Sequence, residues 1–162
     1  MIYFDDVCKV YSTGTEAVKH TTLHIEKGEF AFIVGPSGCG KSTLMKMLLK
    51  EEEPTSGEIY INGKPITNLS RKKIPYLRRK MGVVFQDFRL LQDKNVYENV
   101  AFAMRVIGAN PNIIKKQVPN VLSLVGLLHK AKAYPDQLSG GEQQRVAVAR
   151  AIVNNPMMLI AS

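Results

Sequence analysis

Short apolar runs along the chain predict six β-strands. They cover residues 2–4, 23–25, 30–34, 59–61, 81–85 and 157–161. The runs at 30–34, 81–85 and 157–161 are apolar throughout, which is typical of parallel strands covered on both faces. The earlier runs fit an antiparallel edge, and the Asn62-Gly63 pair predicts a hairpin turn. The pattern therefore indicates a parallel core with an antiparallel edge.

Helical periodicity separates these runs. It predicts helices over residues 42–49, 95–107 and 140–153, and another that begins after Asn110-Pro111. Pro119 interrupts the helix after Asn110, so we expect a kink or two short helices there. Strands that alternate with helices indicate an α/β fold. We expect one domain, with an α/β core from residues 1–87 and 139–162 and an inserted helical subdomain at 88–138.

Composition agrees with a globular protein, because 45% of the 162 residues are apolar and 22% are charged. The longest apolar runs, such as 30–34 and 157–161, are far shorter than the roughly 18 residues that a membrane span needs. The first residues lack the basic start and apolar middle of a signal peptide. We therefore expect the chain to stay in the cytoplasm.

The net charge of +8 is concentrated in one segment. Residues 71–80 hold six basic side chains and no acidic one, and without them 16 basic residues stand against 14 acidic residues. One interpretation is a solvated face. The other is contact with an anionic partner or with phospholipid headgroups.

A glycine-rich loop follows the apolar run at 30–34. Residues 35–42 read Gly-Pro-Ser-Gly-Cys-Gly-Lys-Ser and match the phosphate-loop pattern G-x-x-x-x-G-K-[ST] between a strand and a helix. Its backbone N–H groups can converge on a phosphate, Lys41 can reach the β- and γ-phosphates, and Ser42 can ligate Mg²⁺. Cys39 is either a reactive thiol that nucleotide protects or a small side chain that merely fits.

A second helix start has a similar character. Leu138-Ser139-Gly140-Gly141-Glu142-Gln143 contains a capping box, with Ser139 as the N-cap and Glu142 three residues later. Two glycines in the first helical turn lower helix stability, which suggests that something approaches the backbone closely. Bare amides at a helix N-terminus bind anions, so the sequence predicts two phosphate-binding surfaces.

Residues 35–42 together with 138–143 resemble the nucleotide-binding subunits of ABC transporters, and the resemblance covers essentially the whole chain. It implies a P-loop NTPase fold with ATP and Mg²⁺ as cofactors. It assigns catalytic roles to Lys41 and Gln86 and Mg²⁺ contacts to Ser42 and Gln86. Tyr11 looks like the aromatic residue that stacks on adenine, with a packed tyrosine at a strand end as the alternative. The implied nucleotide contacts are Tyr11, Gly35, Ser37, Gly38, Cys39, Gly40, Lys41, Ser42, Thr43, Ser139, Gly140, Gly141 and Glu142.

The middle of the chain points to one subfamily of these subunits. Residues 74–91, 96–101 and 105–109 are similar to the FtsE family of cell-division ATP-binding subunits. This implies a membrane partner of FtsX type, a homodimer with ATP sandwiched at its interface, and a place on the inner face of the plasma membrane. The alternatives are the ATPases of lipoprotein-release and macrolide-export transporters, which share both phosphate motifs.

The family pattern puts a Walker B aspartate where this chain has Ser162, with the general-base glutamate and a switch histidine further on. We therefore expect a chain that is incomplete at its C-terminus and that binds ATP but hydrolyses it poorly. A non-catalytic binding module is the alternative. DNA-repair ATPases with the same signature need a long coiled coil, and the 52 positions from Gln86 to Leu138 are too few for it. No nucleic-acid partner is expected.

Overall fold

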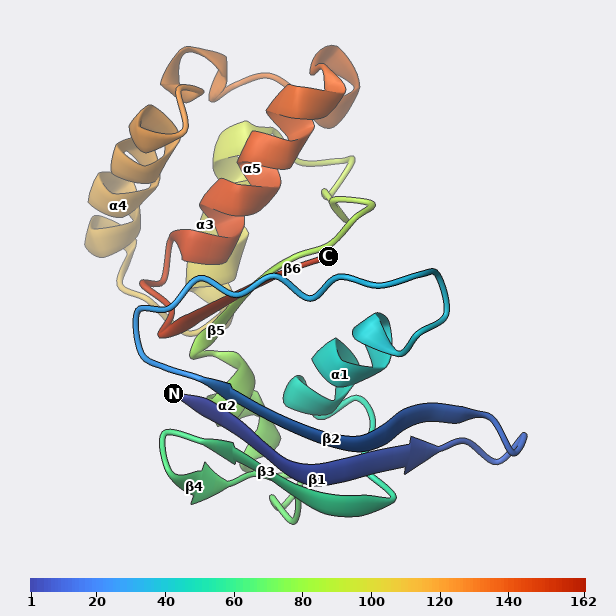
Figure 1. Cartoon of the computed structure of the whole chain (residues 1–162). Helices are drawn as coiled ribbons and strands as arrows, with labels where there is room; N and C mark the ends of the chain where they lie inside the picture. The colour runs from blue at the N-terminus through green and yellow to red at the C-terminus, as the bar shows by residue number, and fades with distance from the viewer. The chain divides into compact units, whose positions relative to one another are not determined.

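The computed structural model describes residues 1–162, and these form two units, Met1–Pro75 and Tyr76–Ser162. The first unit is built on an antiparallel sheet of order β2-β1-β3-β4 (Figure 1). Its elements are β1 (Ile2–Val10), β2 (Glu16–Ile25), α1 (Lys41–Leu48), β3 (Ser56–Ile61) and β4 (Lys64–Pro65). The predicted antiparallel strands are therefore confirmed, and they are longer than the apolar runs.

One face of this sheet carries the core of the first unit. Phe4, Val7 and Ile59 are fully buried, and Met47 of α1 is buried with them. Val7 lies three positions after Phe4, so alternation alone would place it on the opposite face. The β1 register shifts between Phe4 and Val7, where Asp6 has a positive φ (47°), and this irregularity returns Val7 to the buried face. The turn between β3 and β4 is the predicted hairpin, in which Asn62 and Gly63 both adopt positive φ (50° and 73°).

The run at 30–34 is not a strand, which corrects the sequence prediction. Phe30, Phe32 and Val34 are 82%, 80% and 85% exposed, and no backbone hydrogen bond joins this run to a strand. Figure 1 shows the connection from β2 to α1 as irregular chain. A fully apolar strand needs a parallel neighbour and cover on both faces. The sheet of the first unit is wholly antiparallel and supplies neither.

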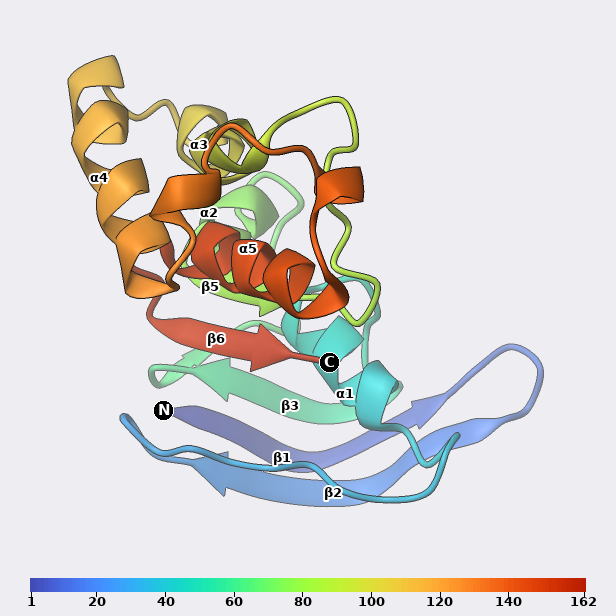
Figure 2. The same cartoon turned by 90° about the horizontal axis from the view of Figure 1, so that it is seen from above.

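The second unit is a helical layer on a parallel strand pair, β5-β6 (Figure 2). A short helix, α2 (Ile74–Arg78), leads into it across the boundary of the two units. Its other elements are β5 (Met81–Val84), α3 (Val96–Val106), α4 (Pro111–Leu124), the 3₁₀ turns η1 (Leu128–Lys130) and η2 (Pro135–Gln137), α5 (Gly140–Ile152) and β6 (Met158–Ala161). Of the three runs predicted as parallel strands, those at 81–85 and 157–161 are confirmed as the parallel pair β5-β6, and the helices α3 to α5 are confirmed as well.

The core of the second unit lies where α5 meets β5 and α3. Val96 and Val100 of α3, and Val146 and Ala149 of α5, are completely buried there. Asn99 is equally buried, but its amide group is fully hydrogen-bonded. It accepts from the Leu91 N–H and donates to carbonyl oxygens of residues 91, 94 and 95. Asn99 therefore fixes the loop before α3 without leaving a buried polar atom unpaired.

Two details of this unit differ from the sequence predictions. The sequence predicts a kink or two short helices at Pro119; helix α4 runs unbroken through this proline, so the second alternative is wrong. The proline removes one hydrogen bond, and the burial of Val118 and Leu122 compensates for it. Strand β6 is covered on one face only, because Ile160 is buried whereas Leu159 is 50% exposed.

No helix of the structure is long and apolar enough to cross a lipid bilayer. The predicted helical insertion at 88–138 lies wholly within the second unit, together with the strands and the helix α5 that flank it.

Candidate functional site

The glycine-rich loop at 35–42 begins α1, as the sequence predicts. Gly38 and Gly40 adopt positive φ of 80° and 92°, and Gly40 is the N-cap of the helix. A Cβ atom on Gly40 would lie 2.1 Å from the Ala17 carbonyl oxygen of β2. Two constraints therefore require glycine at position 40. Its backbone has a left-handed conformation, and a side chain there would collide with the sheet.

The side-chain ammonium of Lys41 folds back onto this loop. Its ammonium donates to the carbonyl oxygens of Gly35 (2.6 Å) and Pro36 (2.7 Å) and lies 3.5 Å from the Cys39 sulfur. The first turn of α1 has no acidic residue. A positive side chain and the free amides of a helix start therefore occupy the same loop, which is the requirement for binding an anion.

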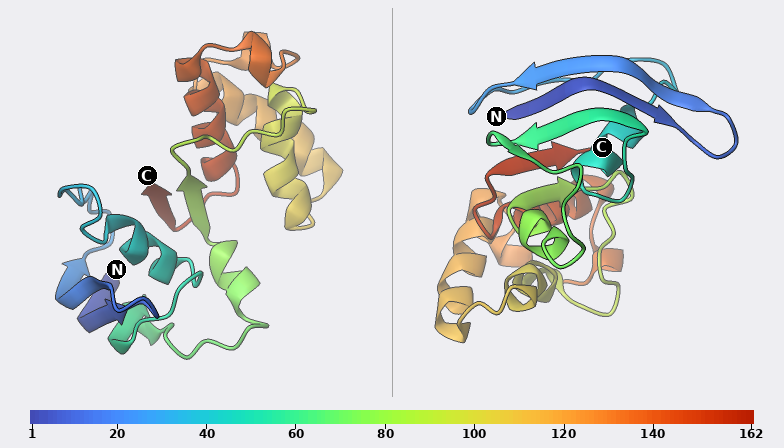
Figure 3. Two further views of the ribbon diagram at one scale, coloured as in Figure 1. Left: turned by 90° about the vertical axis from the view of Figure 1, so that its right-hand side faces the viewer. Right: turned by 90° about the horizontal axis from the view of Figure 1, so that it is seen from below.

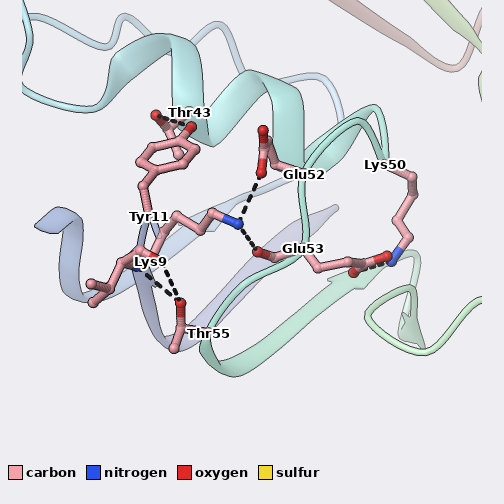
Figure 4. Close-up of polar contacts among 8 residues, drawn as sticks. Lys9, Tyr11, Thr43, Lys50, Glu52, Glu53 and Thr55 are labelled. Carbon is pink, nitrogen blue, oxygen red and sulfur yellow. Dashed lines mark hydrogen bonds and ion pairs between the residues drawn. The ribbon is translucent and has the colours of Figure 1, made fainter. Parts of the chain in front are cut away.

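The remaining loop positions differ in exposure. Ser37, Cys39 and Ser42 are exposed, so their polar atoms can reach a ligand in solvent. Thr43 is buried, and its hydroxyl lies 3.2 Å from the Tyr11 hydroxyl (Figure 4). Thr43, which follows the loop in α1, thus has its side chain turned into the protein.

Tyr11 is fixed against α1 by this hydroxyl contact and by a neighbouring lysine. The Lys9 ammonium lies 5.1 Å from the centre of the Tyr11 ring. Lys9 is itself held by the Glu52 carboxylate at 2.9 Å and the Glu53 carbonyl at 2.8 Å, as Figure 4 shows. The ring is half-buried and directly adjoins the helix that Lys41 begins. Its predicted stacking on adenine stays a prediction.

The second glycine-rich element begins α5 in the second unit. The capping box is confirmed, because the Ser139 hydroxyl accepts from the Glu142 N–H at 3.3 Å and the Glu142 carboxylate accepts from the Ser139 N–H at 2.9 Å. Gln143 holds the preceding chain through the carbonyl oxygens of Pro135 and Leu138. The start of α5 is thus fixed on both sides, while Ser139 and Gly140 stay exposed.

The glycines of this second element are not required by the fold of the chain. A Cβ atom on Gly140 would meet nothing within 4 Å, and one on Gly141 would only touch the end of the Arg145 side chain at 4.0 Å. Neither residue has a positive φ. Because glycine lowers helix stability without benefit to this chain, its presence favours an external group that approaches the backbone of α5.

Lys130 is a contact of this element that sequence reasoning missed. Its ammonium, in η1, lies 2.5 Å from the Glu142 carboxylate. The Lys130 ammonium, with the hydrogen bonds from Ser139, lowers the pKa of Glu142 from its ordinary 4.5 to about 2. Lys130 therefore offsets a negative charge at a helix start that is predicted to bind an anion. No local sequence pattern pairs residues that lie twelve positions apart on different elements.

Gln86 is exposed in the loop that follows β5. The sequence did not predict the contact between this loop and Arg150. Phe88 and Arg89 have positive φ (57° and 45°), and their carbonyl oxygens accept from the Arg150 guanidinium at 2.6 and 2.7 Å. Burial lowers the pKa of Arg150, which comes from α5. One side chain thus connects the loop of Gln86 to the helix that Ser139 caps.

The two units divide the predicted site residues between them. Tyr11 and residues 35–43 lie in the first unit, where the structure brings them together around the start of α1. Gln86 and residues 139–142 lie in the second unit, where Arg150 connects their two segments.

The chain matches the ABC transporter family over residues 18–161. The cell division ATP-binding protein FtsE of Bacillus subtilis (strain 168) is 56% identical over 161 residues, which cover 99% of this chain and 71% of that protein. The protein of the same name from Escherichia coli (strain K12) is 48% identical over 161 residues, covering 99% of this chain and 72% of its own length.

Solved structures agree in fold. A dimeric, post-hydrolysis state of the ATP-binding cassette MJ0796 bound to ADP and Pi is similar with a TM-score of 0.89 and 37% identity, over 99% of this chain and 73% of that one. CbiO1 from Clostridium perfringens, part of the ABC transporter complex CbiONQ, is similar with a TM-score of 0.91 and 36% identity, over 99% and 64% of the two chains.

Replacing Lys130 by Met is expected to raise the pKa of Glu142 above its value of about 2, because the largest cause of the lowered pKa is removed. The pKa should stay below 4.5, since the Ser139 N–H still donates to the carboxylate. The folded-state pKa is lowered, so the stabilisation by this carboxylate is complete above about pH 4.5 and is lost as the pH falls towards 2. A titration of the Glu142 carboxyl carbon by NMR measures the change.

Lys132→Met is the matched control, because Lys132 is exposed, forms no ion pair and belongs to the same connection before α5. It should leave the pKa of Glu142 at about 2. Equal titration curves for the two variants would contradict the role of Lys130.

Proposed function

Because the chain belongs to the ABC transporter family of ATPases, we propose that it is the ATP-binding subunit of a membrane complex that acts in bacterial cell division. The observation that carries the proposal is the presence of two helix starts built for anions. One holds Lys41 among loop carbonyls, and the other exposes two glycines that the chain itself does not need. ATP supplies phosphate groups for both.

In the proposed complex, Gly38, Gly40 and Lys41 hold the β- and γ-phosphates. A phosphate oxygen replaces the carbonyl oxygens that Lys41 contacts in this structure. Mg²⁺ binds few protein ligands and shares the phosphates of its nucleotide, which fits the single exposed hydroxyl of Ser42. By the family resemblance, Gln86 would contribute a further ligand for Mg²⁺, and Tyr11 would hold the adenine by stacking.

The two phosphate elements act in different copies of the chain. In a homodimer, Ser139, Gly140 and Gly141 of one copy cover the γ-phosphate that the other copy holds, so ATP joins the two. The solved dimeric cassette at 37% identity supports a dimer, and the open space beside Gly140 leaves room for a phosphate at its backbone. The membrane partner is proposed to be of FtsX type, which places the chain on the inner face of the plasma membrane. The names of the relatives support the role in cell division, and the FtsX-type partner rests on the family resemblance of the sequence.

Turnover by this chain is proposed to be slow. Ser162 stands where the family has the aspartate of the Mg²⁺ shell, and its N–H and hydroxyl both contact the Val84 carbonyl oxygen of β5 (3.0 and 3.5 Å). A serine supplies no negative charge to Mg²⁺. The chain therefore retains the groups proposed to bind nucleotide, but position 162 supplies no carboxylate to the Mg²⁺ shell.

Nucleotide binding is tested at Cys39, whose exposed sulfur lies 3.5 Å from the Lys41 ammonium. MgATP is expected to slow alkylation of Cys39, because the bound phosphates cover the loop. Lys41→Ala should abolish this protection, which is the ratio of the alkylation rates with and without MgATP in each variant, because loss of the nearby ammonium also changes the rate without nucleotide. The rate is measured by mass spectrometry, with half-buried Cys8 as the internal reference. Labelling that saturating MgATP leaves unchanged would reject the proposed function.

Slow turnover is tested by steady-state phosphate release with MgATP. The wild-type rate is expected to lie close to that of Lys41→Ala, which removes the central phosphate contact. Protection of Cys39 by MgATP, measured on the same preparation, shows that a low rate does not reflect absent binding. Phosphate release well above background that Lys41→Ala abolishes would show that Ser162 does not limit hydrolysis.

Gly140→Ala separates folding from function at the second element. It is expected to raise the free energy of unfolding by up to about 1 kcal/mol, because alanine favours a helix and open space surrounds this position. The same change should weaken ATP-dependent dimerisation, since the new methyl group keeps the phosphate away from the backbone. Chemical denaturation and sedimentation with MgATP measure the two effects. A variant that dimerises as well as the wild type would refute the role of this glycine.

A further inference from the structure

The segment 71–80, here called the basic segment, is the most charged part of the surface. Its six basic residues are all exposed, and it contains no acidic residue. They are Arg71, Lys72, Lys73, Arg78, Arg79 and Lys80. The segment is continuous in the chain and includes α2. Its charges therefore lie close together along the backbone, whatever the arrangement of the rest of the molecule.

Acidic neighbours balance basic side chains elsewhere in the chain. Lys9, Lys19 and Lys130, for example, each form an ion pair with a glutamate. In the basic segment, the two lysines at 72 and 73 and the pair Arg79-Lys80 form no ion pair. Uncompensated charges of one sign repel each other and favour an anionic surface nearby.

The basic segment also presents apolar groups to solvent. Tyr76 is 63% exposed, and the Arg79 guanidinium lies 5.2 Å from the centre of its ring. Helix α2, which Figure 3 shows in green, buries no residue completely, and Ile74 and Leu77 are only half-buried. Tyrosine with an apolar body and a polar end is favoured at the boundary between lipid and water.

We propose that the basic segment binds the headgroups of anionic lipids and so holds the chain at a membrane surface. Clusters of four to eight basic residues beside an exposed aromatic have the chemistry that such headgroups recognise. The preference for lipid over another polyanion rests on the proposed function, which places the chain beside a membrane protein. The lipid contact itself needs neither ATP nor a protein partner.

The test measures binding of the full chain to phosphatidylcholine vesicles with and without phosphatidylserine, in the absence of nucleotide. Binding is expected only with phosphatidylserine and should weaken as salt is added, because exposed charges are screened. Lys72→Gln/Lys73→Gln and Arg79→Gln/Lys80→Gln should each lower the affinity roughly 25-fold, at about fivefold for each charge removed. Sedimentation with the vesicles gives the affinities.

Lys115→Gln/Lys116→Gln on α4 is the matched control. Both lysines are exposed, and the double variant removes the same net charge from another surface. It should change the affinity by less than about twofold, since charges beyond a Debye length contribute little. Equal losses in the control and in the basic segment would overturn the proposal, because net charge alone would then explain binding.

Two further outcomes are decisive. No binding to phosphatidylserine vesicles, or tighter binding to duplex DNA than to those vesicles at the same salt, overturns the lipid assignment. Protection of Cys39 by MgATP is measured on the same protein. Intact protection without vesicle binding rejects the lipid proposal alone, whereas vesicle binding without protection rejects the proposed nucleotide function alone.

Discussion

The packing of α5 against β5 and α3 is the constraint on which the second unit depends. Val146 and Ala149 are completely buried there, so this face of the helix cannot rotate without opening the core. That fixed orientation leaves Ser139 exposed at one end of the helix and directs Arg150 into the loop after Gln86 near the other. The two segments of this unit that contain predicted site residues are therefore held in a fixed arrangement by one rigid helix.

The glycines of the two phosphate elements show how a structural role and a functional role can be separated. Gly40 has a positive φ, and a side chain there would collide with the Ala17 carbonyl, so the fold alone requires it. Gly140 has an ordinary backbone and open surroundings, so the fold gives no reason for it. The sequence pattern treats these glycines alike. Only the environment of each Cα distinguishes them.

Local patterns predicted what local interactions determine. The loop around Gly40 and Lys41, the capping box at Ser139 and the proline at the start of α4 each involve residues a few positions apart, and the structure has them as predicted. The run at 30–34 was predicted wrongly because strand formation needs a partner that the run itself does not specify. The same limit hid Lys130 and Arg150, whose partners lie 12 and about 62 positions away.

The charged groups also depend on partners that are distant in the sequence. Glu142 lies at a helix start, where its carboxylate favours the helix and opposes a bound phosphate. The distant Lys130 offsets this negative charge, since its ammonium pairs with the Glu142 carboxylate. Lys72, Lys73, Arg79 and Lys80 of the basic segment have no such carboxylate within the chain, so their charge is directed outward. The start of α5 thus has its charge compensated within the chain, whereas the basic segment does not, and this difference is the reason to propose an anionic partner outside the molecule.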